Sequence, residues 1–494
     1  MTNEDGQPSA VDARPDASET ERHAGLSAAL RLPPRRLAPL VVLLGAVWGG
    51  LWIVLIPPLQ TPDERNHLCR IWMLSEGRWR GVKVPGRDPG AYGDKLPASL
   101  DDLSRRLGTA RMRFHAEVKL DPADYMGAFD IPTRSDERRY YVFTNTLYYP
   151  PTAYLPQLCG MWVGRLLNLP LVLTIYLIRA ITLAVALALI YFALRQGPPW
   201  AYGLFLLVLM PMTMQQLLCP GGDAMLISAS LLFLTRIWRL RREPDAGPFP
   251  WRDIALLGGL GLIVATAKLV YVPLCFAFLL IPTARFGSAR RRAVIAAGVL
   301  AALAVASAGS VLAPRVHGVF EGGGLSPAAV KGIIHHPFRL VHAVVRNLGI
   351  GFTRGWTYHS AYGILGWFDT PVPWVFGLLH GLALFVGLKP RGPDDSGIPS
   401  AWAGVMLMVA GLACLPLINA AVLVKMNREA YLIQGRYYLP LIPPLGMAAH
   451  LLLARWRRLA QARWHVPGLL YPVVAGLSFA GATVAVVSRY YLEL

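Results

Sequence analysis

A short run of charged side chains after the first apolar segment is the stretch of the sequence best suited to chemistry. On a helix, His67 lies one turn beyond both Asp63 and Glu64, so a carboxylate and an imidazole share one face. Such a pair can deprotonate a hydroxyl group or hold a metal ion. A capping box is the alternative interpretation, with Thr61 as N-cap and Glu64 three residues later. That interpretation requires neither Asp63 nor His67.

A second carboxylate, Asp223, follows two glycines and opens another apolar run. Alone, this pattern is typical of a helix N-cap. The membrane topology derived below places Asp223 on the same side as Asp63, which favours a functional role. We therefore treat Asp63, Glu64 and Asp223 as candidate catalytic residues. The sequence identifies no cofactor; if a divalent metal ion binds, its candidate ligands are Asp63, His67 and Asp223.

Further polar side chains are expected at the same membrane face. An ionisable residue in an apolar segment, such as Lys268, is by default a functional candidate, with snorkelling as the alternative. Arg339, His342 and Arg346, spaced i, i+3 and i+7, form one polar helix face. Arg436 suits phosphate, because a guanidinium group makes paired contacts with two oxygens. The candidate substrate or phosphate ligands, together with His67, are Lys268, Tyr271, Arg346, Gln434 and Arg436.

These residues must be positioned by membrane-spanning helices. The chain has 494 residues, of which 54% are hydrophobic and 16% charged, and the apolar residues occur in blocks such as 40–55 and 401–424. Each block is long enough to cross a hydrocarbon core of about 30 Å, where the backbone must be helical. The sequence therefore predicts an all-α integral membrane protein with about eleven transmembrane helices, near residues 37–57, 171–194, 200–218, 223–239, 253–267, 269–284, 293–313, 372–388, 401–424, 437–454 and 467–488.

The basic residues predict the orientation of these helices. The formal net charge is +19 at pH 7, and most of it lies in clusters beside apolar runs, which argues against a nucleic-acid-binding surface. Alternate loops carry the clusters, so the N-terminus is predicted to be cytoplasmic. Residues 1–36 are expected to be a disordered cytoplasmic tail, followed by one transmembrane domain at 37–490. Two long outer loops follow, about 58–170 and 314–371, the first with juxtamembrane helices.

An ordered set of motifs resembles a bacterial family of multi-spanning membrane proteins without an assigned reaction, and that family is similar in turn to the GT-C glycosyltransferases. The resemblance covers about residues 40 to 490. It rests on Pro62-Asp63-Glu64 with His67, Tyr149-Pro150-Pro151 with Tyr154, Met210-Pro211 followed by Asp223, Ala267-Lys268 with Tyr271-Val272-Pro273, Gly366-Trp367-Phe368-Asp369-Thr370 and Gln434-Gly435-Arg436-Tyr437.

The resemblance implies an activity and a site. GT-C enzymes take a sugar from a polyprenyl-phosphate carrier and transfer it outside the cytoplasm, using one acid after the first span and another between the third and fourth. Asp63 or Glu64 corresponds to the first acid and Asp223 to the second, and Arg179 matches an arginine in the second span of related branches. Lys268 and Arg436 would then hold the leaving phosphate.

The partners implied are a lipid-linked sugar donor, an envelope glycan or lipid acceptor and membrane lipids, with no nucleic acid. The location implied is the bacterial inner membrane. The competing hypothesis is a transporter or flippase, in which the same charged residues bind a substrate that crosses the membrane. Transporters commonly contain inverted repeats with ionisable residues near the midplane. The sequence shows no such repeat, and its acids cluster beside the long loops, which favours the transferase.

Overall fold

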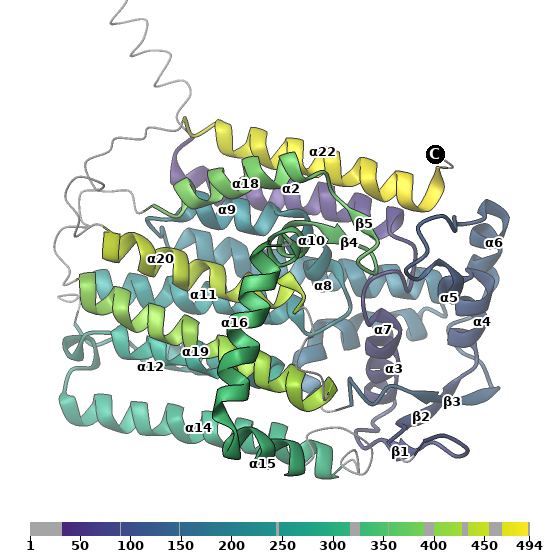
Figure 1. The fold of residues 1–494 in the computed structure, drawn as a ribbon, viewed down its shortest axis with the longest axis horizontal. Helices are drawn as coiled ribbons and strands as arrows, with labels where there is room; N and C mark the ends of the chain where they lie inside the picture. The colour runs from purple at the N-terminus through teal and green to yellow at the C-terminus, as the bar shows by residue number, and fades with distance from the viewer. Residues whose placement is uncertain are drawn as a thin grey trace, which may run out of the picture.

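The computed structural model describes residues 32–88, 90–147, 149–243, 247–316, 327–353, 355–389, 400–426, 433–453 and 467–492. Within these ranges the chain is mostly helical. Figure 1 shows most helices running beside one another, with the first long loop (residues 58–170) at one end of the bundle. Nearly all of the predicted N-terminal tail, residues 1–31, lies outside the described residues.

Within the described ranges, four helices are long and apolar enough to cross a membrane: α2 (Pro34–Leu55), α8 (Leu171–Arg195), the segment Trp402–Ala421 of α19 (Ser400–Met426) and α22 (Leu470–Tyr491). The bent pair α9 (Ala201–Leu209) and α10 (Pro211–Leu218) is a fifth if it is counted as one span. The structure therefore supports a membrane protein with several spans. It does not establish the predicted number of about eleven.

Helical structure is present in each of the other predicted ranges, in pieces that are shorter or less apolar. Their bounds are α11 (Asp223–Arg242), α12 (Trp251–Ala267), α14 (Ala289–Val316), α18 (Trp374–Gly387), the 3₁₀ helix η8 (Gly435–Leu441) and α20 (Ile442–Leu453). The range 269–284 consists of η3 (Leu269–Tyr271), α13 (Val272–Cys275), η4 (Phe276–Leu280) and the start of η5 (Thr283–Phe286).

Proline and an extended residue explain the breaks. The axis bends by 67° between α9 and α10, where Pro211 supplies no backbone N–H and occupies the first position of the new helix. Lys268 ends α12 in an extended conformation, with φ −154° and ψ 116°. The range 200–218, predicted as one span, is thus bent, and 253–284 is one regular helix followed by short pieces.

The first long loop is a folded unit that contains both helices and strands. Its helices are α3 (Glu64–Ser75), α4 (Ser99–Arg106), α5 (Thr109–Met112), α6 (Pro122–Gly127) and α7 (Leu155–Leu166). An antiparallel sheet of order β1-β2-β3 joins β1 (Val82–Lys83), β2 (Tyr92–Pro97) and β3 (Arg138–Val142). The predicted loop helices are confirmed, and the all-α assignment is wrong here, because paired strands satisfy the backbone of this polar segment.

The second long loop, 314–371, is also structured over its described part. It contains α15 (Pro327–His335), α16 (Pro337–Thr353), α17 (Trp356–Tyr362) and a hairpin of β4 (Ile364–Leu365) and β5 (Thr370–Pro371). The helix predicted around Arg339, His342 and Arg346 is confirmed as α16. Figure 1 shows α16 running across the direction of the other helices.

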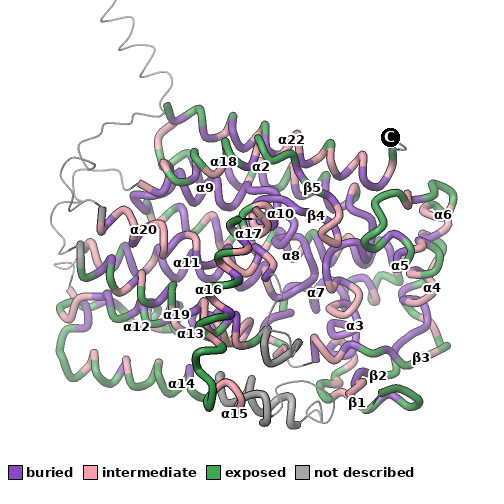
Figure 2. Tube along the Cα trace, viewed as in Figure 1, coloured by how far each residue is buried: buried purple, intermediate pink, exposed green. Residues whose placement is uncertain are grey.

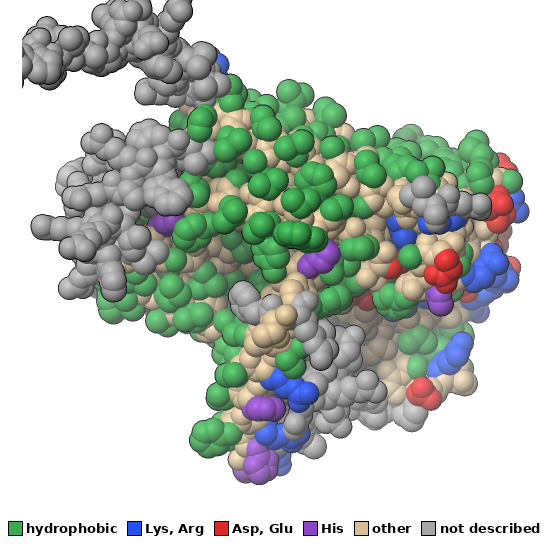
Figure 3. Space-filling model, turned by 45° about the horizontal axis from the view of Figure 1, so that its top comes forward, with side chains coloured by type: hydrophobic (Ala, Val, Ile, Leu, Met, Phe, Trp, Pro, Cys, Tyr) green, Lys and Arg blue, Asp and Glu red, His purple; other side chains and the backbone are tan. Residues whose placement is uncertain are grey.

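Two hydrophobic clusters meet where the first long loop joins the bundle. The larger cluster fills the space between the spans, and the smaller one joins α3, the sheet, α7 and the first turns of α8. Figure 2 shows buried positions in the middle of the bundle and exposed ones on its outer helices. Those outward side chains are apolar: Leu43 on α2 is 60% exposed and Val484 on α22 is 68% exposed. Figure 3 shows this hydrophobic face, with acidic and basic side chains at its right-hand end and further basic and histidine side chains on the part that protrudes at the bottom of the view.

Candidate functional site

Asp63 lies at the junction between the bundle and the first long loop, immediately before α3. Its backbone is left-handed, with φ 62°, a conformation in which aspartate is tolerated better than most residues. One carboxylate oxygen accepts a hydrogen bond from Asn145 at 3.2 Å, and the other lies 3.2 Å from Nη2 of Arg436. The side chain remains 36% exposed. Asp63 is therefore held in place and still accessible.

Glu64 has a different environment, although it is the next residue. Its carboxylate is fully buried and accepts two hydrogen bonds from Arg179, at 2.9 and 2.8 Å. It also accepts from the backbone N–H and the hydroxyl of Thr61. Because α3 begins at Glu64, with Asp63 as N-cap and no side-chain cap, Thr61 does not act as the N-cap. Of the predicted capping box only one half is present, the hydrogen bond from the backbone N–H of Thr61 to the carboxylate of Glu64.

Arg179 also closes the end of the first span. Its guanidinium group donates to the backbone carbonyls of Ile53 and Ile56, at 3.0 and 2.6 Å, and to that of Pro57 at 3.1 Å. Ile53 lies in the last turn of α2, whose C=O groups have no partner within the helix, and Ile56 and Pro57 follow directly after it. The Glu64–Arg179 pair thus joins α2, α3 and α8 at a buried point.

His67, one turn into α3, faces the second acid-bearing segment. Its Nδ1 lies 2.8 Å from the hydroxyl of Tyr154, and a Cβ added to Gly221 would lie 3.2 Å from its Nε2. Burial lowers the pKa of His67 to about 4. The imidazole is therefore neutral near pH 7, and acts there as a hydrogen-bonding group and not as a cation for phosphate.

Asp223 is the first residue of α11 and forms a salt bridge with Lys268. Gly222 is the N-cap and no side chain caps this helix, so the N-cap interpretation of Asp223 is wrong. The ammonium nitrogen of Lys268 also lies 4.5 Å from the ring centroid of Tyr437. Tyr271 is fully buried and donates to the backbone carbonyl of Tyr437 at 2.7 Å. The contacts of Tyr271 give it a packing role beside the pair.

Arg436 joins this group to Asp63. It follows Gly435, whose added Cβ would lie 2.1 Å from the backbone nitrogen of Ala361 in α17, so only glycine allows this approach. Arg436 is 8% exposed, and its Nε and the Oε1 of Gln434 are buried without a hydrogen-bond partner among the described residues. Arg346 is exposed on α16, and no described contact connects it to this cluster.

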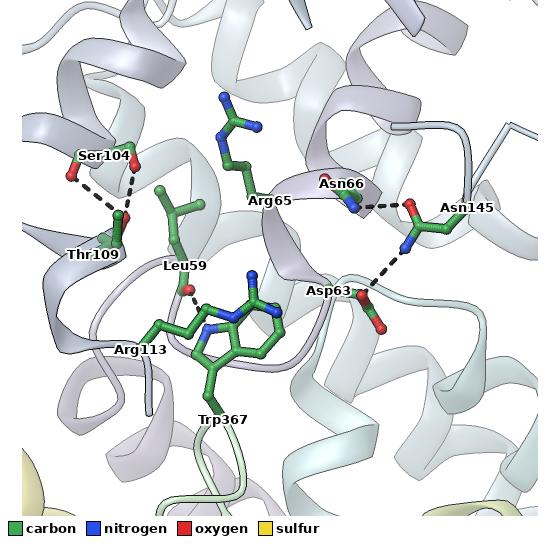
Figure 4. Close-up of a pocket in the computed structure, with 10 residues that line it drawn as sticks. Leu59, Asp63, Arg65, Asn66, Ser104, Thr109, Arg113, Asn145 and Trp367 are labelled. Atoms are coloured by element: carbon green, nitrogen blue, oxygen red, sulfur yellow. Dashed lines mark hydrogen bonds between the residues drawn. The ribbon is translucent and has the colours of Figure 1, made fainter. Parts of the chain in front are cut away.

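A cavity of about 610 Å³ opens beside Asp63 between the two long loops. Figure 4 shows Asp63 next to the hydrogen-bonded pair of Asn66 and Asn145, with Arg113 lying over the indole of Trp367. Trp367 belongs to a motif used for the family resemblance, whereas no sequence signal indicated Asn145 or Arg113. The cavity is lined by Leu59, Asp63, Arg65, Asn66, Ser104, Thr109, Ala110, Arg113, Asn145 and Trp367.

The candidate metal ligands do not form a metal-binding group. In the part of the chain that the structure describes, no three His, Cys, Asp or Glu side chains lie close enough together to hold an ion. Asp63, His67 and Asp223 are each engaged differently, with Arg436, Tyr154 and Lys268. We therefore assign them no metal.

The family of the chain follows from a match over most of its length. The family model described as "Predicted membrane protein (DUF2142)" matches residues 46–445. The chain belongs to this family. The match includes the second half of the first span, both long loops and all the site residues described above, and it confirms the resemblance to a family of membrane proteins. Comparisons with curated proteins and with solved structures find no significant match.

Proposed function

We propose that this DUF2142 protein is a glycosyltransferase of the GT-C type. It would transfer a sugar from a polyprenyl-phosphate donor to an envelope acceptor at the outer face of the bacterial inner membrane, with its N-terminus in the cytoplasm. The observation that carries the proposal is the contact between Asp63 and Arg436, at 3.2 Å, beside a cavity and next to the Asp223–Lys268 pair. Residues from distant parts of the chain thus form two neighbouring pairs, each of one carboxylate and one cation.

Asp63 is the better candidate for the base. It lines the cavity and is partly exposed, whereas both oxygens of Glu64 are occupied by Arg179 in a fully buried pair. A base must reach the proton that it removes. In the proposed step, Asp63 takes the proton of the acceptor hydroxyl as that oxygen bonds to the anomeric carbon. General-base help of this kind contributes about two to four orders of magnitude in rate.

Arg436 is the candidate ligand for the leaving phosphate. When the bond between the anomeric carbon and the phosphate oxygen breaks, the electron pair goes to the phosphate, which then needs a nearby positive charge. The buried Nε–H of Arg436 has no described partner and can donate to a phosphate oxygen. Lys268 supplies a second cation, and Asp223 holds its ammonium group in place.

The test is donor turnover by the purified full-length protein in lipid nanodiscs. Polyprenyl-phosphate sugars of several kinds are supplied, and free polyprenyl phosphate is measured. We expect carrier release that falls at least about 100-fold in Asp63→Asn, while Asp124→Asn, an exposed acid of the same loop paired with Arg106, keeps the wild-type rate.

Arg436→Lys keeps the charge but not the planar fork, so it should raise the donor concentration needed for half-maximal rate more than it lowers the maximal rate. The competing transporter is tested in sealed vesicles. Movement of intact donor to the other leaflet, without carrier release, would refute the transferase.

A further inference from the structure

Arg113 gives the cavity a positive charge that no described carboxylate neutralises. Its guanidinium carbon lies 3.9 Å from the ring centroid of Trp367 and 4.7 Å from that of Phe114. The other charged groups of the cavity wall are paired: Arg65 with Asp101 at 2.6 Å, and Asp63 with Arg436. Among the described residues, Arg113 forms no ion pair. The cavity is therefore suited to a ligand that brings a negative charge.

The two walls that form this corner are fixed to each other by Arg489, near the end of α22. Its guanidinium group pairs with Asp369 at 2.8 Å and donates to the backbone carbonyls of Met112 and Val118, at 2.5 and 2.9 Å. Met112 precedes Arg113, and Asp369 lies two residues after Trp367. The buried ion pair of Arg489 and Asp369 thus holds together the two segments that carry Arg113 and Trp367. The place of the Arg113 cation over the indole therefore does not depend on its flexible side chain alone.

Two non-glycine residues with positive φ flank the same corner. Phe114 follows Arg113 with φ 64°, and Phe368 follows Trp367 with φ 63°. Such a backbone costs free energy for a bulky side chain and persists only where the surrounding structure enforces it. Strain of this kind is concentrated at ligand-binding positions. Here the strained backbone occurs in both segments, the one that supplies Arg113 and the one that supplies Trp367.

We propose that the cavity binds an acidic saccharide, so that the acceptor of the transferase carries a carboxylate or a phosphate group held by Arg113. This inference rests on the proposed function. The planar guanidinium group binds either oxyanion through paired hydrogen bonds, and the indole face stabilises its charge from the other side. Asn66 and Asn145 line the cavity beside Asp63 and offer amide groups to sugar hydroxyls.

The charge of Arg113 also offsets the repulsion between Asp63 and an anionic acceptor. An anionic acceptor is repelled by the carboxylate that must approach its hydroxyl. A cation on the same cavity wall offsets that repulsion, and it holds the acidic group away from the base while the hydroxyl lies beside it. A neutral acceptor has no need of such a residue.

The experiment measures binding of three monosaccharide probes to the full-length protein in nanodiscs by titration calorimetry: glucose, glucuronate and glucose 6-phosphate. At least one of the acidic probes should bind roughly tenfold or more tightly than glucose, because a charge-assisted contact contributes that much. Binding of glucuronate alone assigns a carboxylate, and binding of glucose 6-phosphate alone assigns a phosphate. Equal binding of glucose would overturn the proposal.

Variants connect the preference to Arg113. Arg113→Gln should remove the preference for the acidic probe, and Arg113→Lys should retain part of it, with thermal unfolding confirming that each variant is folded. Arg111→Gln is the control, because Arg111 is an exposed arginine of the same segment that does not line the cavity. An unchanged preference in Arg113→Gln would also overturn the proposal. Binding is measured without a donor, so absent carrier release with intact acid binding refutes only the transferase.

Discussion

At the scale of residues, Asp63 and Glu64 show how neighbouring carboxylates acquire different roles. Both follow the first span, and the sequence offers no reason to choose between them. The structure separates them, since one faces a cavity and the other is enclosed with Arg179, which lies 115 positions further along the chain. A pairing over that distance has no local signature in the sequence. The sequence could therefore predict the acidic motif, but not which carboxylate is exposed to the cavity and which is buried in an ion pair.

Exchanging each carboxylate for its amide should separate stability from activity. Glu64→Gln leaves the buried guanidinium group of Arg179 without its counter-charge, and we expect a loss of about 3 to 5 kcal/mol in the free energy of unfolding. Asp63→Asn removes a partly exposed acid and should change stability by less than about 1 kcal/mol. Denaturant unfolding in detergent measures both. Equal stability of the two variants would contradict the structural role of Glu64.

The titration of His67 predicts a stability change with pH. Burial holds its folded-state pKa near 4, below the ordinary value of 6.5. The folded protein therefore resists a protonation that the unfolded chain accepts. The contribution of His67 to the free energy of unfolding is complete above about pH 6.5 and is lost as the pH falls towards 4. The loss is at most about 1.4 kcal/mol per pH unit.

His67→Gln cannot titrate, and should flatten part of the fall in thermal stability between pH 7 and pH 4.5. His115→Gln, in the same loop, is the control, because the side chain of His115 is 60% exposed. Superimposed stability curves for wild type and His67→Gln would show that this histidine is not the acid-sensitive group.

At the scale of elements, the glycine that precedes Arg436 determines where the cation lies. The added Cβ of an alanine at position 435 would lie 2.4 Å from the carbonyl oxygen of Thr357 and also against Ala361, both in α17. Because these are backbone atoms, either α17 or η8 must shift, and Arg436 moves with η8. Gly435→Ala should cost about 1 to 3 kcal/mol of stability and reduce carrier release.

The matched control is Gly476→Ala in α22, where an added Cβ has nothing within 4 Å. Alanine is the better helix former by roughly 0.5 to 1 kcal/mol, so this variant should be as stable as wild type or more so. Unfolding and carrier release are measured on both variants. A fully active and stable Gly435→Ala protein would show that the close approach is not required.

The elements of the spans were easier to predict than those of the loops. Charge-free apolar blocks require helices, and helices occur in every predicted range. The sheet of the first long loop was not predicted, because β2 pairs with β3 from residues about 45 positions apart, in register from Gly93 opposite Val142 to Pro97 opposite Arg138. Its short strands lack the alternating pattern that identifies a sheet locally. The bend at Pro211 could have been predicted, because a proline within a predicted span indicates a break in the helix.

At the scale of the whole molecule, described contacts divide the helix ends into two groups. One group contains the basic clusters: Arg236 donates to the side chain of Gln196 at 3.0 Å, and the backbone N–H of Phe249 donates to the carbonyl of Arg285 at 2.9 Å. The other group contains the candidate site, where Asp223 meets Lys268. Helix α11 connects the two, with Asp223 at its first residue and Arg236 to Arg242 near its last. The candidate site and these basic residues therefore lie at opposite ends of α11, and which end faces the cytoplasm stays a prediction of the positive-inside rule.

This separation predicts which positions an impermeant thiol reagent reaches in intact cells. Arg87 lies in the first long loop and Arg290 is the second residue of α14, in the basic cluster there, and both are exposed. In a background where the exposed Cys159 is replaced by serine, Arg87→Cys should react from outside and Arg290→Cys only after lysis. Each variant loses one arginine, so the pair is matched in charge.

The physical reason for this expectation is the cost of moving basic clusters across the bilayer, which keeps them cytoplasmic in short loops. Under that topology Asp63 and its cavity face the outside, where the proposed polyprenyl-phosphate donor and envelope acceptor would meet. Labelling of Arg290→Cys in intact cells would reverse the orientation and place the cavity in the cytoplasm. A transferase acting on the outer face would then be excluded, while the contacts among Asp63, Arg436 and Arg113 would still define the site.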